Sequence, residues 1–224
     1  MTYTVLARDP RTGMLGAATA SRSLAVGNAV LALRPGVGVV ASQAWTNRRL
    51  RALVLDELEA GASAAHAAAR IPEWDDRAPL RQVAVLPARG RGAAFTGSET
   101  TAWSGHAVGE DFVVAGNLLT GRAVVEAMAD AAAVLSSPEA GEPVAEAAAI
   151  FAARLVGVLR AGERAGGDAR GRQSAAVVVG EVGGEPDLRV DLRVDDHTDP
   201  LVELDRLVEL RARDLREKVS ARTA

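Results

Sequence analysis

The sequence predicts an α+β protein in which mostly antiparallel sheets are covered by layers of helices. Strand-like segments come in blocks joined by short turns, and helix-like segments come in blocks of their own. Alternating strand–helix–strand units are absent, and so are the G-x-G-x-x-G and P-loop patterns of nucleotide-binding sheets. Because 48% of the 224 residues are apolar, we expect one large domain at residues 1–219, followed by a disordered tail at 220–224.

The first 43 residues predict four strands, because apolar and β-branched stretches are separated by turns that contain Pro and Gly. The turn Asp-Pro-Arg-Thr-Gly at residues 9–13 predicts a hairpin between the first two strands. The expected strands are residues 2–8, 14–19, 28–33 and 37–43.

A helical period follows these strands. Apolar residues recur at the spacing of a helix with one buried stripe, at Leu50, Leu53, Val54 and Leu58. Thr46 or Asn47 is the expected N-cap of this helix, and Ser63 is expected to cap a second helix that ends at Arg70.

The second half of the chain repeats the arrangement in blocks. Four more strands are expected, at residues 82–87, 92–96, 101–106 and 111–115. Two helices and two strands come next, at 118–135, 143–164, 174–179 and 188–194. The last helix is marked by Asp199 as its N-cap and Pro200 at its first position. Its apolar stripe is suited to pack on the protein's own sheet or on a second copy, and consists of Leu201, Leu204, Val208 and Leu215.

The composition excludes several classes of protein and site. A net charge of −3 without a sustained basic run argues against nucleic-acid and anionic-membrane partners. The absence of cysteine excludes disulfides, thiolate metal sites and cysteine nucleophiles. No apolar segment is long enough to span a membrane, and the first residues lack the features of a signal peptide, so we expect a cytoplasmic protein.

Polar residues gather where apolar strands end, and such junctions are where a scaffold can aim functional groups. The clusters are Ser21-Arg22-Ser23, residues 42–47, Gly116-Asn117, residues 161–174 and residues 191–197. Each cluster also has an ordinary structural explanation, because Ser, Thr and Asn cap helices and form turns, and Asp191 and Arg193 can pair along a strand.

The stretch AGERAGGDARGRQS, residues 161–174, is the densest of these clusters. Gly166-Gly167 permits positive φ and close approach to a neighbour or ligand, and Asp168 and Arg170 are spaced for a local ion pair. Gln173 and Ser174 then lead into a buried strand. A structural loop and the wall of a site both fit this composition.

Metal and serine-triad chemistry are not favoured. Asp195-Asp196-His197 with Asp199 does not match a recognised ligand spacing, and acidic residues before a helix are favoured by its dipole alone. No G-x-S-x-G elbow is present, and His106 fits a turn or core position. We expect no metal and no cofactor.

The combination of several segments resembles a known bacterial family. The segments are residues 4–9, 20–27, 43–47, 95–97, 105–106, 116–117, 166–168, 171–175 and 190–197. Together they resemble the domain-of-unknown-function 1028 family, which is grouped with the N-terminal-nucleophile (Ntn) hydrolases. The resemblance covers about residues 2–210 and implies a four-layer αββα sandwich, in agreement with the order of blocks.

The resemblance also implies a mechanism. In Ntn hydrolases the first residue of the mature chain attacks an amide carbonyl, and its own α-amine acts as the base. Thr2 would take this role once Met1 is removed, whereas a retained Met1 would leave Thr2 without a free amine. The implied catalytic partners are Ser21, Arg22, Asn117, Asp168 and Ser174. The implied substrate-binding residues are Gln43, Asn47, His106, Arg170, Gln173, Asp195 and His197.

Three functions remain open from the sequence. The first is an Ntn-type amidohydrolase acting on a small molecule through Thr2. The second is a hydrolase on the same fold that uses internal acid and base groups such as His106, Asp168 or Asp195. The third is a non-catalytic protein for ligand binding or assembly. In each case we expect a small-molecule partner and a homo-oligomer, most simply a dimer.

Overall fold

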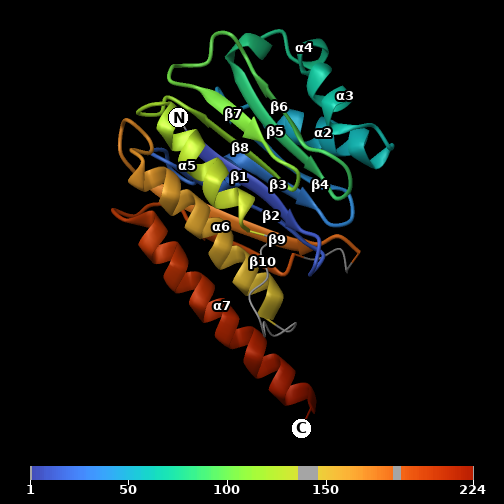
Figure 1. Ribbon diagram of the computed structural model, residues 1–224, viewed down its shortest axis with the longest axis vertical. Coiled ribbons are helices and arrows are strands. Elements are labelled where there is room, and N and C mark those ends of the chain that lie inside the picture. Colours follow the sequence, from blue (N-terminus) through green and yellow to red (C-terminus); the bar gives the residue numbers. More distant parts are fainter. Residues whose placement is uncertain (1, 136–145, 184–187, 224) are drawn as a thin grey trace.

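Two antiparallel sheets are stacked face to face, and helices cover the outer face of each sheet (Figure 1). The computed structural model describes residues 2–135, 146–183 and 188–223. The predicted α+β class and the four-layer αββα arrangement are therefore confirmed.

The larger sheet has six strands in the order β10-β9-β2-β1-β8-β7. Its strands are β1 (Thr2–Asp9), β2 (Met14–Ser21), β7 (Gly105–Val108), β8 (Phe112–Asn117), β9 (Ser174–Glu181) and β10 (Val190–Val194). The smaller sheet has the order β3-β4-β5-β6. Its strands are β3 (Leu31–Arg34), β4 (Gly38–Ala44), β5 (Arg81–Pro87) and β6 (Ala93–Thr96).

The predicted hairpin forms between β1 and β2, with Asp9 facing Met14 at its closed end. The Asp9 carboxylate accepts a hydrogen bond from the Arg11 backbone N–H at 3.0 Å, and Gly13 takes a positive φ of 68°. This turn fixes the register that carries the polar end of β2 back to the start of β1.

The space between the sheets is filled by small aliphatic side chains, as a chain with 3% aromatic residues requires. Leu6 and Leu15 of the larger sheet meet Val39 and Leu86 of the smaller one. The short helix α1 (Val26–Val30) inserts its buried Val26 and Val30 into this layer.

Helices form the two outer layers. The smaller sheet is covered by α2 (Arg49–Glu59) and α3 (Ala64–Ala69), followed by α4 (Ile71–Trp74) and the 3₁₀ turn η1 (Ala78–Leu80). The larger sheet is covered by α5 (Arg122–Ala133), α6 (Ala147–Arg164) and α7 (Pro200–Thr223). The predicted caps are confirmed at Ser63 and Asp199, whose side chains accept from the N–H groups of His66 and Val202.

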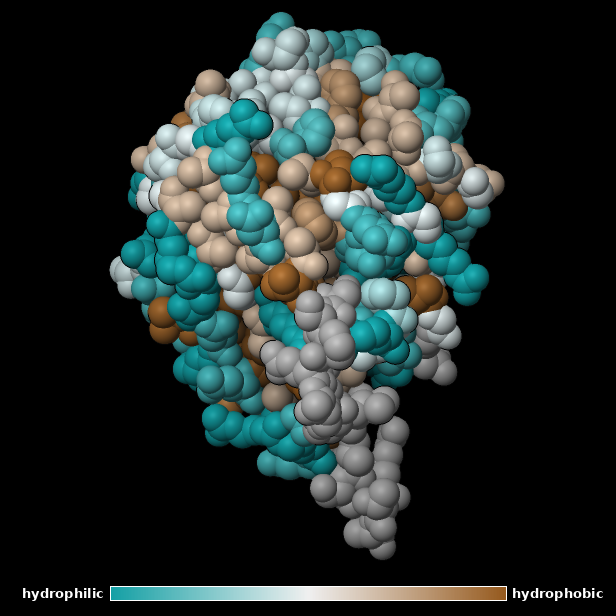
Figure 2. Space-filling model, in the orientation of Figure 1, coloured by the Kyte–Doolittle hydropathy of each residue, from teal (hydrophilic) through white to brown (hydrophobic). Residues whose placement is uncertain are grey.

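The apolar stripe of α7 packs on the protein's own core. Leu201, Leu204 and Val208 are buried in the cluster shared with α6 and the larger sheet, and Leu215 is partly buried. The opposite face of the helix is mostly hydrophilic (Figure 2). Since α7 extends to Thr223, it passes residue 219, and fraying of the last residues stays a prediction.

Three predicted elements differ from the structure. The strand expected at 28–33 is helical up to Val30, because Val26 and Val30 of α1 pack into the layer between the sheets. The strand expected at 101–106 begins only at Gly105, since the backbone at Thr101 and Trp103 instead bonds to residues 118 and 119. For the same reason the helix expected from residue 118 begins at Arg122. The expected start of α6 at residue 143 lies outside the described residues.

Replacing Leu6 with alanine should lower the free energy of unfolding by about 2–5 kcal/mol, because Leu6 is fully buried between the sheets. Leu210→Ala is the matched control, since Leu210 is 43% exposed on α7 and should change stability by about 0.5 kcal/mol or less. Urea unfolding followed by circular dichroism measures both. Equal losses would contradict the assignment of Leu6 to the core between the sheets.

Candidate functional site

Four strand ends meet at one rim of the larger sheet. β1 begins at Thr2, which pairs with Asn117 at the end of β8. β2 ends at Ser21, which pairs with Ser174 at the start of β9. All four residues are at least 95% buried. The antiparallel register thus brings together residues from distant parts of the sequence, as the resemblance implied for the site.

Thr2 is held by both its side chain and its carbonyl group. Thr2 Oγ1 donates to Ser21 Oγ at 3.4 Å. Its carbonyl oxygen accepts from Asn117 Nδ2 at 3.4 Å and from Gln43 Nε2 at 3.5 Å. Because Gln43 belongs to the smaller sheet, the first residue of β1 is fixed by groups from both sheets.

Gln82 on β5 orients the two amides that hold Thr2. Its Oε1 accepts from Gln43 Nε2 at 2.8 Å and from Asn117 Nδ2 at 3.1 Å. Its Nε2 donates to the carbonyls of Gly105 and Gly116 at 3.1 and 2.9 Å. Gln82 is fully buried and is not among the site residues predicted from the sequence, although an amide in the apolar stretch QVAVLP is an informative signal.

Two further threonines extend this polar network inward. Thr4 Oγ1 donates to Gln43 Oε1 at 2.6 Å and lies 2.8 Å from Thr19 Oγ1. Both hydroxyls are fully buried. A buried polar group is costly unless it is hydrogen-bonded, so each of these side chains requires the others to remain in place.

Asp168 joins the glycine-rich loop to the end of β2. Its Oδ2 accepts from the Arg22 backbone N–H at 2.8 Å, and its Oδ1 accepts from the Arg170 N–H at 2.8 Å. The Arg170 guanidinium lies 3.3 Å from Asp168 and 3.5 Å from Ser23 Oγ. The predicted local pair of Asp168 and Arg170 therefore forms, and it clamps the residues that follow Ser21.

Glycine is required at 166 because of a close approach. Gly166 has a φ of 122°, and a Cβ built there would lie 2.1 Å from Thr120 Oγ1. Gly167 has a φ of 57° and accepts a backbone hydrogen bond from Thr120 at 3.2 Å. These glycines let the loop close against the segment after β8, which places Asp168 beside Ser21-Arg22.

Ser174 is committed to holding the start of α1. Its Oγ accepts from the Val26 N–H at 3.1 Å and donates to the Ser23 carbonyl. The neighbouring Gln173 donates its backbone N–H to the Ser21 carbonyl at 3.0 Å. The position of Ser174 therefore supports the rim, and its hydroxyl is already engaged.

The outer part of the rim is polar and solvent-exposed. Arg22 Nη1 donates to Gln173 Oε1 at 2.8 Å, and Gln173 Nε2 donates to Asp196 Oδ1 at 3.0 Å. The Asp195 carbonyl accepts from Ala25, and His197 Nδ1 accepts from the Asp199 N–H at 2.9 Å. Arg22, Gln173, Asp195 and His197 thus lie on one side of Ser21 and Ser174.

Asn47 lies outside the Thr2 network. Its Nδ2 donates to Asp75 Oδ2 at 2.7 Å, and its Oδ1 accepts from the Arg49 N–H, which supports the start of α2. The hydrogen bond from Arg81, together with that from Asn47, lowers the pKa of Asp75 to about 2 against the opposing effect of burial. The structure thus gives Asn47 a structural role.

His106 lies on the far side of Gln82 from Thr2. Its Nδ1 is 2.9 Å from Thr96 Oγ1, which also accepts from Gln82 Nε2 at 3.0 Å. The ring lines a separate cavity of about 480 Å³ with Trp103 and residues of α5. Partial desolvation lowers the pKa of His106, so the neutral form is favoured in the folded protein.

Tyr3, beside Thr2, remains a neutral phenol. Burial raises its pKa, and the negative charges of Glu163 and Asp168 raise it further. Because neighbouring residues of a strand point to opposite faces, the Tyr3 ring packs in the core under the helices of the larger sheet, whereas Thr4 points toward the smaller sheet.

Backbone strain is concentrated at this rim. Ala25, Ala44 and Leu118 have positive φ values of 53°, 68° and 54°, and no other described residue except glycine does. They follow or end β2, β4 and β8, the strands that supply Ser21, Gln43 and Asn117. Such conformations cost about 1–3 kcal/mol each and cluster at functional sites.

The sequence matches the model of the family of unknown function DUF1028 over residues 2–204. The chain belongs to this family. A solved DUF1028 structure, protein SPO2555 from Silicibacter pomeroyi, is 32% identical, with a TM-score of 0.79 over 93% of this chain and 88% of that chain. No curated protein matches the chain in sequence.

Two more distant solved structures are Anbu proteins. The Anbu Gly-1 mutant from Hyphomicrobium sp. strain MC1 is 14% identical, with a TM-score of 0.40 over 98% of this chain and 100% of that chain. Anbu, the ancestral beta-subunit, from Yersinia bercovieri is 10% identical, with a TM-score of 0.39 over 98% and 95%. At these scores the likeness carries no functional argument for the DUF1028 chain.

The described part of the DUF1028 chain contains neither a membrane-spanning helix nor a cluster of metal ligands. None of its described helices is both long and apolar enough to cross a membrane. Within the same residues, no group of three or more His, Cys, Asp and Glu side chains is placed to hold a metal ion.

Replacing Gln82 with methionine should lower the free energy of unfolding by roughly 1–3 kcal/mol, because the amides of Gln43 and Asn117 lose a buried acceptor. Gln173→Met is the matched control, since Gln173 is only partly buried at the rim and its partners can bond to water instead. Chemical denaturation measures both changes. A larger loss for Gln173→Met would contradict the central place of Gln82.

His106 should make stability depend on pH. The pKa of His106 is lower in the folded protein than in the unfolded chain. Below about pH 6.5 the unfolded chain is therefore protonated at this side chain to a greater extent, which favours unfolding. Wild type should therefore lose stability relative to His106→Gln as the pH falls from about 7 through the folded pKa. Urea unfolding at a series of pH values measures this difference, and a constant difference would contradict it.

Proposed function

We propose that the protein is an Ntn-type hydrolase that cleaves an amide or related C–N bond of a small molecule. The nucleophile is Thr2 Oγ1, after removal of Met1. The observation that carries this proposal is the position of Thr2, where four strand ends meet and its hydroxyl lies 3.4 Å from Ser21 Oγ.

The reaction follows from the groups at Thr2. The α-amine of Thr2, with an ordinary pKa near 8, takes the proton of Oγ1 as the oxygen attacks the amide carbonyl. The resulting ammonium gives that proton to the leaving nitrogen when the C–N bond breaks. Water then attacks the Thr2 ester, with the amine again as the base, and releases the acid and free Thr2.

Asn117 and Gln43 act as positioning residues in this proposal. Both amides donate to the Thr2 carbonyl, and both also donate to Gln82. These bonds support a role in holding Thr2 at a fixed angle. For Asn117 they argue against a direct contact with the oxyanion of the reaction, because its two N–H groups are already engaged.

The groups around Ser21 supply orientation and substrate contacts. Ser21 Oγ accepts a hydrogen bond from Thr2 Oγ1 and keeps this Thr2 hydroxyl directed toward the rim. Asp168 fixes the backbone of Arg22, whose guanidinium is exposed and available to a substrate carboxylate. The polar wall beyond it consists of Arg170, Gln173, Asp195 and His197.

We infer that the protein acts in the cytoplasm and that it assembles as a dimer.

A β-lactone tests the nucleophile without knowledge of the substrate. Thr2 Oγ1 should open the lactone ring by attacking its carbonyl, which leaves an ester on Thr2 and adds the mass of the whole reagent. Tryptic mass spectrometry should find this mass on the N-terminal peptide, with Met1 absent. The labelling rate should rise with pH through about 8, as the amine loses its proton.

Thr2→Ala should abolish the label, whereas Thr46→Ala, at an exposed threonine near the same rim, should leave the rate unchanged. A label that persists in Thr2→Ala, or a retained Met1 in protein that reacts at Thr2, would contradict the mechanism. Removal of Met1 without any labelling would count against it as well, and would favour the ligand-binding alternative.

A further inference from the structure

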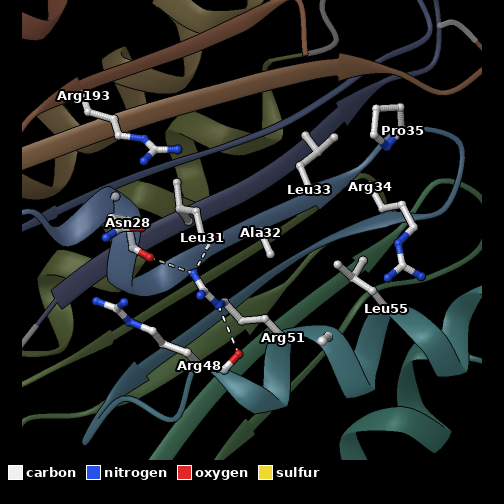
Figure 3. A pocket seen from close by; sticks show the side chains of 12 residues that line it. Asn28, Leu31, Ala32, Leu33, Arg34, Pro35, Arg48, Arg51, Leu55 and Arg193 are labelled. Atoms are coloured by element: carbon white, nitrogen blue, oxygen red, sulfur yellow. Dashed lines mark hydrogen bonds between the residues drawn. The ribbon is translucent and has the colours of Figure 1, made fainter. Parts of the chain in front are cut away.

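A second cavity, of about 560 Å³, lies away from Thr2 between α1, β3 and the start of α2 (Figure 3). Four arginines line it, and no carboxylate of the described residues does. They are Arg34, Arg48, Arg51 and Arg193. Since the protein has a net charge of −3, this concentration of positive charge is local.

Arg51 is the central cation of the cavity. Its Nη1 donates to the carbonyls of Asn28 and Leu31 at 3.0 and 2.8 Å, and its Nε donates to the Arg48 carbonyl at 3.3 Å. No carboxylate of the described residues pairs with it. A partly buried guanidinium bonded only to neutral carbonyls keeps its full charge uncompensated.

The cations nearest to Arg51 increase this imbalance. Desolvation lowers the pKa of Arg51, and the positive charges of Arg48 and Arg193 lower it further. Arg48 makes no side-chain hydrogen bond or ion pair with the part of the chain that the structure describes. In Figure 3 the side chains of Arg48, Arg51 and Arg193 lie on the side of the cavity near Asn28.

The other two arginines are compensated at the edges of the cavity. Arg193 pairs with Asp191 at 2.9 Å through Nε and Nη2, and Arg34 pairs with Asp56 and Glu59. None of these carboxylates lines the cavity. Within the part of the chain that the structure describes, Arg48 and Arg51 are therefore the two cavity charges without a counterion.

We propose that this cavity binds the phosphate group of a small organic molecule. Two uncompensated guanidinium groups match the charge of a phosphate dianion, and their planar N–H groups suit its oxygens. Arg193 contributes its remaining Nη1. The adjoining apolar wall of Leu31, Leu33 and Leu55 accommodates the organic part of the ligand.

Isothermal titration calorimetry with phenyl phosphate tests the proposal. The wild-type protein should bind one equivalent, and inorganic phosphate should bind more weakly because it cannot use the apolar wall. Arg48→Ala should weaken binding about tenfold or more, and the double variant Arg48→Ala/Arg193→Ala should abolish it. Arg51 is left intact, because its bonds hold the backbone between α1 and β3.

Arg49→Ala is the matched control, since Arg49 is an exposed neighbour on α2 that does not line the cavity. It should bind phenyl phosphate within about twofold of wild type, and so should Thr2→Ala, because this site is separate from the proposed nucleophile. Absence of saturable binding in wild type would overturn the proposal. Equal affinity in the double variant, or an equal loss in Arg49→Ala, would do so as well.

Discussion

The carboxamide of Gln82 is the contact on which the geometry of the rim depends. Its side chain belongs to the smaller sheet and bonds to the backbone of the larger one, through the carbonyls of Gly105 and Gly116. Most of the interface between the sheets is apolar and therefore non-directional. A fully buried amide must find its partners, so Gln82, together with the buried Gln43, fixes how the two sheets align at the end where Thr2 begins.

The rim also differs mechanically from the rest of the molecule. The opposite end of the β1–β2 hairpin closes with an ordinary Asp-Pro-Arg-Thr-Gly turn, whose one positive φ falls on a glycine. At the rim, Ala25, Ala44 and Leu118 adopt left-handed backbone conformations that glycine would adopt more easily. The surrounding hydrogen bonds hold these residues in place, which is consistent with an arrangement retained for the positions of its side chains.

The layered arrangement and most helices and strands could be predicted from the sequence, because the period of apolar residues and the residues that form turns are local signals. The prediction failed at residues 28–30, where Val30, suited to a strand, instead fills the gap between the sheets as part of α1. At the rim, Thr2, Ser21, Asn117 and Ser174 were proposed from the family resemblance and their places at strand ends. Gln82 was missed because its partners come from β4, β7 and β8, and they meet only when β4 pairs with β5 and the two sheets stack.

In the side-chain hydrogen bonds that lead from Gln82 through Gln43 and Asn117 to Thr2, each donor and each acceptor is fixed. The backbone carbonyls of two glycines determine this assignment. The carbonyls of Gly105 and Gly116 can only accept, so the Gln82 nitrogen must face them and its oxygen must face Gln43 and Asn117. Those two side chains are then obliged to turn their nitrogens toward the start of the chain. The lone pairs of the Thr2 carbonyl are thereby oriented by backbone atoms more than 100 residues away in sequence.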